Sequence, residues 1–213
     1  MYGAIISNNA GGYSFVQSGA NGRILRYRFN YKDQPGRYIY LYDRDSGDYW
    51  STSWQPVGKP LEKYKSECRH GTSYTVISSE YSSIKTEVLY YVPLHKTYEV
   101  WRVRVQNAGA QARNLSAFGY AELTASSNYE QDGINLQYTQ FITRTYFKGG
   151  KMILQTCNEN CGRQADGSSG LERFFALAGS KVTSYCGDRD EFSAGTAPMQ
   201  TPKRWNEAAA AIS

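Results

Sequence analysis

The sequence predicts an all-β fold, a two-layered antiparallel β-sandwich or a barrel, on three observations. Apolar and polar side chains alternate along short segments that recur at about 8–12-residue spacing, which is typical of sandwiches and barrels. Gly, Asn, Asp and Ser gather between these segments, as turn residues do. The chain of 213 residues has 19 Tyr against 8 Phe and 4 Trp, and tyrosine favours strands. Its length permits one large β domain.

Residues 36–43, GRYIYLYD, begin the series of predicted strands. Tyr38, Tyr40 and Tyr42 fall on one face, because side chains alternate across a strand, and two aliphatic residues fall on the other. Three tyrosines on one face suit either a core or a surface whose rings stack on a sugar, and composition alone favours the core. Residues 43–49, DRDSGDY, then predict a hairpin tip, because Asp and Ser bond their own backbone there.

The middle of the chain holds the clearest alternation. Residues 73–81 and 84–93 predict two strands, and the second ends at Pro93 because proline cannot donate to a strand ladder. Residues 98–107 place Trp101 and two valines on one face, with two arginines on the opposite face. One side of this strand is therefore apolar and the other is mostly polar.

The last third of the chain continues the pattern. Residues 106–114 predict a turn, and residues 112–123 follow as another alternating strand. Lys-Gly-Gly at 148–150 predicts a hairpin between two later strands. These later strands are residues 139–147, 151–157, 172–179 and, as a candidate, 181–186. No long helix is predicted, because the alanine-rich segment 206–213 is short and terminal.

The charge pattern disfavours several classes of partner. The 24 Lys and Arg and 19 Asp and Glu give a net charge of +5 and are interspersed, whereas a nucleic-acid surface clusters its basic residues. No run of apolar residues is long enough to span a membrane. The start, MYGAIISNN, lacks the charged and apolar regions of a signal peptide. We therefore expect a cytoplasmic protein that binds neither nucleic acid nor membrane.

The cysteines do not predict a metal site. Only two of the four lie close together, in CNENC, and the chain has just two histidines, which is a poor zinc framework. The cysteines are Cys68, Cys157, Cys161 and Cys186. We expect reduced thiols, with a Cys157–Cys161 disulfide as the alternative. Cys68 and His70 share a strand face, but no orienting third group is in view for a catalytic pair.

Several blocks carry a resemblance to a known family. They are ISNNAGGYSF, RILRYRFN, DQPGRYIYLYDRDSGDYWSTSWQPV, VWRVRVQNAG and RNLSAFGYAEL, and DRDEFSAG at 188–195 is the last. In this order they resemble the N-terminal domain of glycoside hydrolase family 94, which includes cellobiose and N,N'-diacetylchitobiose phosphorylases. The resemblance runs from about Ile6 to residue 195, so it covers almost the whole chain.

This resemblance implies a large twisted supersandwich, of the galactose mutarotase type, followed in the family by a helical linker and an (α/α)₆ barrel. Family enzymes cleave a β-linked disaccharide with inorganic phosphate and release an α-sugar 1-phosphate with inversion. One carboxylic acid protonates the glycosidic oxygen, while phosphate takes the place of the water used by an inverting hydrolase. The resemblance implies no metal and no organic cofactor, with inorganic phosphate as co-substrate.

The resemblance also implies a division of labour between domains. Residues 1–195 correspond to the sandwich, residues 196–213 form a divergent tail, and the catalytic barrel is absent. The general acid and the phosphate-binding groups are expected on that missing barrel. We therefore expect a fragment that does not catalyse phosphorolysis alone and that belongs to a homodimer when full length.

The family places a loop after the GYAEL strand at the acceptor subsite, often that of the partner subunit. Here this loop, SSNYEQDGINLQY, contains Asn128, Asn135, Gln137 and Tyr138 as candidate substrate-binding residues. Asn135 and Gln137 match an Asn-x-Gln-Arg pattern, whereas Tyr138 replaces its arginine. A tyrosine cannot supply the two charge-assisted hydrogen bonds of a guanidinium. Glucose, N-acetylglucosamine, an aldonic acid and another glucoside therefore remain open as acceptors.

Alternatives to this reading stay open at the level of sequence. The loop can be an ordinary solvated connection, and Arg26 and Arg28 favour ion pairs at the rim of the sandwich. Trp50 and Trp54 favour packing over sugar stacking. The whole chain can instead be a stand-alone carbohydrate-binding module, or a domain used only for assembly.

Overall fold

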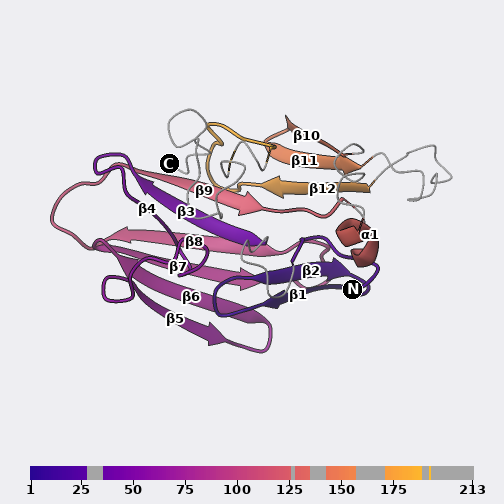
Figure 1. The fold of residues 1–213 in the computed structure, drawn as a ribbon, viewed down its shortest axis with the longest axis horizontal. Helices are drawn as coiled ribbons and strands as arrows, with labels where there is room; N and C mark the ends of the chain where they lie inside the picture. Colours follow the sequence, from indigo (N-terminus) through magenta and orange to yellow (C-terminus); the bar gives the residue numbers. More distant parts are fainter. Residues whose placement is uncertain (28–35, 126–127, 135–142, 157–170, 189–191, 193–213) are drawn as a thin grey trace.

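The computed structural model describes residues 1–27, 36–125, 128–134, 143–156, 171–188 and 192. Within these residues the chain forms strands throughout and one short helix (Figure 1). The strands are β1 (Tyr2–Ile6), β2 (Gly12–Val16), β3 (Arg37–Asp43), β4 (Tyr49–Ser51), β5 (Lys65–His70), β6 (Tyr74–Tyr81), β7 (Ile84–Tyr91), β8 (Val100–Asn107), β9 (Leu115–Ala121), β10 (Thr143–Lys148), β11 (Lys151–Thr156) and β12 (Leu171–Ala176). The helix is α1 (Tyr129–Ile134).

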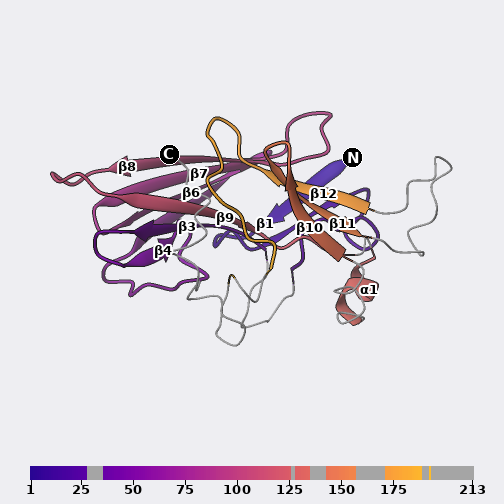
Figure 2. The same cartoon turned by 90° about the horizontal axis from the view of Figure 1, so that it is seen from above.

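Every strand pair is antiparallel, and the described strands form four sheets. Their orders are β5-β6-β7-β8, β4-β3-β9, β10-β11-β12 and β1-β2. Figure 2 shows the four-stranded sheet as a layer over β3 and β4. The prediction of an antiparallel all-β fold is therefore confirmed.

Two clusters of buried side chains join the β4-β3-β9 sheet to the four-stranded sheet. The first consists of Ala10, Tyr38, Tyr40, Ile77, Val88, Tyr90, Phe118 and Tyr120. The second consists of Leu41, Trp50, Tyr64, Ile84 and Ala117, with Trp54 packed against it. Each cluster takes residues from strands far apart in the sequence, so burial between the layers stabilises the sandwich. The prediction that Trp50 and Trp54 serve packing is confirmed.

The tyrosines of β3 belong to the core. Tyr38 and Tyr40 are 0% exposed, so they do not form an open sugar platform. Phe175 packs at Gly119, whereas Phe192 lies 5.5 Å from the ring of Tyr120, the next residue of β9. Adjacent residues of a strand point to opposite faces, so the β3–β9 pair is covered on both sides. This explains why nearly every side chain of β3 is buried.

The hairpin tip between β3 and β4 follows the prediction. Gly47 has a φ of 72°, and its N–H donates to the Asp43 carbonyl at 2.8 Å. The Ser46 hydroxyl donates to Asp43 Oδ2 at 2.6 Å, and Arg113 donates to the same oxygen. Burial alone would raise the pKa of Asp43, but the hydrogen bonds from Ser46, Arg113 and the Asp45 N–H outweigh it and lower that pKa.

Most predicted strands are confirmed within the described residues, and the misses have physical reasons. The candidate strand 181–186 is wrong, because those residues form no regular structure. Strands β1, β2, β4 and β5 were not among the predicted strands. Strand β5 reads KSECRH and lies at a sheet edge, where nearly every side chain is exposed, so no apolar alternation marks it.

Candidate functional site

The predicted site residues fall partly outside the described part of the chain. The structure does not describe Asn135, Gln137 and Tyr138, so their role as site residues stays a prediction. Asn128 is described, and its Nδ2 donates to Asn21 Oδ1 at 3.0 Å. This contact ties the start of the predicted acceptor loop to the segment that follows β2.

Part of that loop forms a helix that the sequence reading did not predict. Helix α1 has six residues and carries Glu130 and Asp132 in its first turn, where negative charge complements the helix dipole. The Asp132 N–H donates to the Asn128 carbonyl at 3.1 Å. The helix follows β9 in the chain and lies on the side of the molecule where β12 begins (Figure 1). The described part of the loop, residues 128–134, is therefore not simply a solvated connection.

Asp132 fixes this helix to the sandwich. Its side chain is buried, with 2% of the residue exposed. Arg26 Nε donates to one carboxylate oxygen at 2.7 Å, and Arg26 Nη2 donates to the other at 2.9 Å. The Ala125 N–H donates to Asp132 as well, at 2.8 Å. The carboxylate thus holds both the chain before α1 and the strand-like segment at Arg26, through charge-assisted bonds.

Arg26 also binds the residue that follows β9. Its Nη1 donates to Glu122 Oε1 at 2.9 Å, and the Tyr120 hydroxyl donates to the other oxygen at 2.9 Å. Burial alone would lower the pKa of Arg26, but Asp132 and Glu122 outweigh it and raise that pKa. The prediction of an ion pair for Arg26 is confirmed, whereas Arg28 lies outside the described residues. We call Arg26, Glu122 and Asp132 the anchor cluster.

Backbone bonds reinforce the anchor cluster. The Arg26 N–H donates to the Glu122 carbonyl at 2.8 Å, and the Thr124 N–H donates to the Ile24 carbonyl at 2.9 Å. Thr124 Oγ1 also donates to the Arg23 carbonyl at 2.7 Å. These contacts extend the antiparallel pairing beyond β9 as far as Thr124. In the sequence, the only sign of a helix here was the pair of acidic residues in the first turn of α1.

The Cys68–His70 pair has the orienting partner that sequence reasoning missed. Cys68 Sγ lies 3.4 Å from His70 Nε2, and His70 Nδ1 lies 2.9 Å from Thr75 Oγ1. Burial raises the pKa of the Cys68 thiol, so the reactive thiolate is disfavoured. The pair therefore gives no support for nucleophilic catalysis. Cys68 and Cys186 are free thiols, as predicted, and the other two cysteines lie outside the described residues.

The described residues contain neither a candidate metal site nor a candidate membrane-spanning helix. No group of three or more His, Cys, Asp or Glu side chains there has the arrangement to hold a metal ion. In the same ranges, no helix has the length and apolar character needed to cross a membrane. In the anchor cluster, each carboxylate oxygen of Glu122 and Asp132 accepts a hydrogen bond from the domain itself, so the cluster joins α1 and the end of β9 to the segment at Arg26.

Comparison with known proteins assigns the family. The sequence model of the glycosyl hydrolase 94 supersandwich domain matches residues 1–211. The chain belongs to this family. It is 37% identical over 190 residues to an N,N'-diacetylchitobiose phosphorylase of Vibrio proteolyticus, an alignment that covers 88% of the chain and 23% of the relative. It is 41% identical over 147 residues to the N,N'-diacetylchitobiose phosphorylase of Vibrio furnissii, covering 68% of the chain and 18% of the relative.

More distant relatives share shorter stretches. A solabiose phosphorylase of Paenibacillus borealis is 28% identical over 88 residues, which is 41% of the chain and 11% of the relative. The chain thus spans less than a quarter of the length of the Vibrio relatives it matches. The supersandwich prediction is confirmed by the family match, and the relatives are longer phosphorylases.

Proposed function

We propose that this chain is the N-terminal domain of an inverting disaccharide phosphorylase that acts on a β-linked N-acetylglucosaminide or glucoside. The observation that carries the proposal is the 37% identity to an N,N'-diacetylchitobiose phosphorylase over 88% of the chain. The supersandwich match over residues 1–211 supports it. We propose a cytoplasmic location, with inorganic phosphate as the co-substrate of the complete enzyme.

In the proposed reaction, phosphate attacks the anomeric carbon and the bond to the glycosidic oxygen breaks. A carboxylic acid donates its proton to the departing oxygen, and the anomeric configuration inverts. We assign this acid to an (α/α)₆ barrel outside the chain. The sandwich contributes no acid or base to these steps, and its proposed role is to shape the acceptor side.

For the acceptor subsite we propose Asn135 and Gln137, with Tyr138 at its edge. Carboxamide groups both donate and accept, so they suit sugar hydroxyls. The anchor cluster supports this role, because Asp132 is fixed to the sandwich only three positions before Asn135. In the proposed homodimer this loop reaches the active site of the partner subunit.

A chimera tests the proposal. Residues 1–190 of this chain replace the matching segment of the Vibrio proteolyticus phosphorylase, and release of sugar 1-phosphate from N,N'-diacetylchitobiose is measured. The chimera is expected to turn over, whereas the 213-residue chain alone is expected to be inactive. A folded, dimeric chimera without activity would contradict the proposed substrate, and activity of the isolated chain would contradict the division between domains.

Gln137→Ala in the same chimera tests the acceptor role. In the direction of synthesis, the KM for the acceptor sugar is expected to rise at least tenfold, because a site that recognises its substrate by hydrogen bonds is sensitive to the loss of one partner. The KM for the sugar 1-phosphate is expected to change far less. Gln111→Ala, at an exposed turn, is the matched control. Equal losses for both substrates would place Gln137 away from the acceptor.

A further inference from the structure

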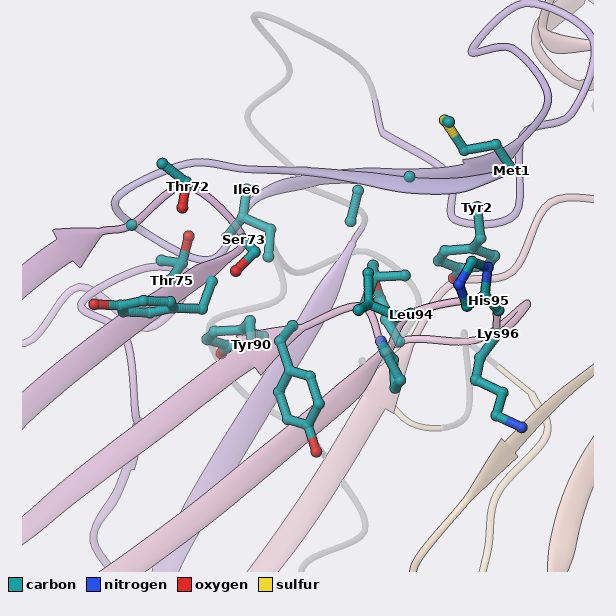
Figure 3. A pocket seen from close by; sticks show the side chains of 18 of the residues that line it. Met1, Tyr2, Ile6, Thr72, Ser73, Thr75, Tyr90, Leu94, His95 and Lys96 are labelled. Atoms are coloured by element: carbon teal, nitrogen blue, oxygen red, sulfur yellow. The ribbon is translucent and has the colours of Figure 1, made fainter.

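A groove opens on a part of the sandwich to which the described residues of the proposed acceptor loop, 128–134, do not contribute. It encloses about 770 Å³ and is bounded by β1, by the turn between β5 and β6, and by the connection from β7 to β8 (Figure 3). Its lining comes from residues 1–6, 71–75 and 90–99. A groove of this volume accommodates a ligand of one or two sugar rings.

Tyrosine rings supply the apolar part of the groove. Tyr74 is 49% exposed at the start of β6, and it is paired across the sheet with Tyr91 of β7. The Tyr74 ring lies against the backbone of Gly71, where an added Cβ would fall 2.4 Å from its Cε1 atom. The ring therefore occupies the space that a side chain at position 71 would need. A half-exposed tyrosine ring offers an apolar face to a ligand and has few rotatable bonds to order.

Tyr90 also lines the groove, but as part of the first core cluster. Only 1% of the residue is exposed, and its ring centroid lies 6.3 Å from that of Trp101. Tyr90 therefore supplies a buried aromatic wall rather than an open surface.

Glu99 supplies a fixed polar group. It accepts from the Ser14 hydroxyl at 2.8 Å and from Trp101 Nε1 at 2.9 Å. Arg37 Nε lies 3.1 Å from the same carboxylate as a charge contact, off the line of a hydrogen bond. Because Arg37 balances its charge, Glu99 suits a neutral ligand better than a cation. The hydroxyls of Thr72, Ser73 and Thr75 also line the groove (Figure 3).

We propose that this groove binds a neutral pyranose sugar, with the apolar ring face on Tyr74 and the sugar hydroxyls toward Glu99 and the Ser and Thr hydroxyls. Rings beside neutralised charges and hydroxyl groups match the two chemical sides of a sugar. This site goes beyond the proposed function, because none of the described residues of the acceptor loop, 128–134, lines it. It equips the sandwich to hold a carbohydrate chain in addition to any acceptor role.

Calorimetry on the 213-residue chain tests the proposal, with glucose, N-acetylglucosamine and N,N'-diacetylchitobiose titrated without phosphate. Saturable binding with a Kd on the order of 1 mM is expected for at least one sugar. Tyr74→Ala is expected to weaken it at least tenfold, which corresponds to about 1.4 kcal/mol. Tyr185→Ala is the matched control, because that tyrosine is 51% exposed and lies outside the groove.

Gly71→Ala gives a second variant that keeps every polar group of the groove. It displaces the Tyr74 ring and is expected to weaken binding as Tyr74→Ala does. Absence of binding by the unaltered chain, or binding that survives both substitutions, would overturn the proposal. Because the chimera assay measures turnover and this titration measures binding to the sandwich alone, failure of one leaves the other standing.

Discussion

Strand β3 and helix α1 both border β9, but different forces hold them. Strand β3 pairs with β9 over seven residues and is buried on both faces, so apolar packing dominates there. Helix α1 packs at the end of β9 through Arg26, Glu122 and Asp132, which are joined by charge-assisted bonds. The difference separates the part of the molecule that stabilises the fold from the part that positions the proposed acceptor loop.

The two regions are expected to respond differently to substitution. Loss of volume in a packed core destabilises the whole domain, because neighbouring side chains relax only partly. Loss of a peripheral ion pair opens a local segment at a free energy below that of global unfolding. Substitutions in the two regions therefore separate global unfolding from local opening.

The largest effect is expected at Trp50, which lies 1% exposed in the second core cluster. Trp50→Ala is expected to lower the free energy of unfolding by about 3–5 kcal/mol, measured by urea titration, because it leaves a large cavity. Leu61→Ala is the control at an exposed position and is expected to change it by less than about 0.5 kcal/mol. Similar losses for the two variants would show that Trp50 is not a core residue.

Asp132→Asn is expected to loosen α1 while leaving the core intact. Replacing the carboxylate weakens two bonds from Arg26 and leaves the buried guanidinium with less compensating charge, a local loss of about 2 kcal/mol. Hydrogen exchange at Ala125 and along α1 is expected to accelerate about 30-fold, with exchange in β3 unchanged. Glu130→Gln, at an exposed position of the same helix, is the control. Faster exchange in both regions would remove the distinction between them.

Asp43→Asn removes the negative charge at the end of β3 and so tests how much an ion pair stabilises the core region. Its lowered pKa means that the carboxylate stabilises the fold above the usual Asp value of about 4, and that this stability is lost as the pH falls through the lowered value. At pH 7 the variant is expected to be about 1–2 kcal/mol less stable than the parent chain. The difference is expected to vanish once both are titrated below the lowered pKa of Asp43. A difference that persists there would assign the effect to packing.

The smallest effect is expected from removing one buried hydroxyl. Tyr38 Oη makes no hydrogen bond among the described residues, whereas Tyr120 Oη donates to Glu122. Tyr38→Phe is therefore expected to leave the unfolding midpoint unchanged or to raise it slightly. Tyr120→Phe is expected to cost about 1 kcal/mol. The reverse order would mean that Tyr38 has a partner in the folded protein.

Alternation predicted the strands that have one apolar and one polar face, such as β7 and β8, and the strongly apolar β3. It missed β5, because an exposed edge strand shows no contrast between its faces. It also missed β4, which has three residues, too few for a period to appear. The six-residue α1 gave no helical period either, and its position depends on Asp132 contacting Arg26, 106 residues away in sequence.

The sequence by itself determined the all-β class, the main strands and the family, because side-chain alternation and ordered blocks are local properties of the chain. Tertiary structure alone decided which tyrosines are core, where α1 is fixed, and that residues 1–6, 71–75 and 90–99 meet in one groove. The physical reason is that burial and ion pairing depend on contacts between residues distant in sequence, which no local pattern records.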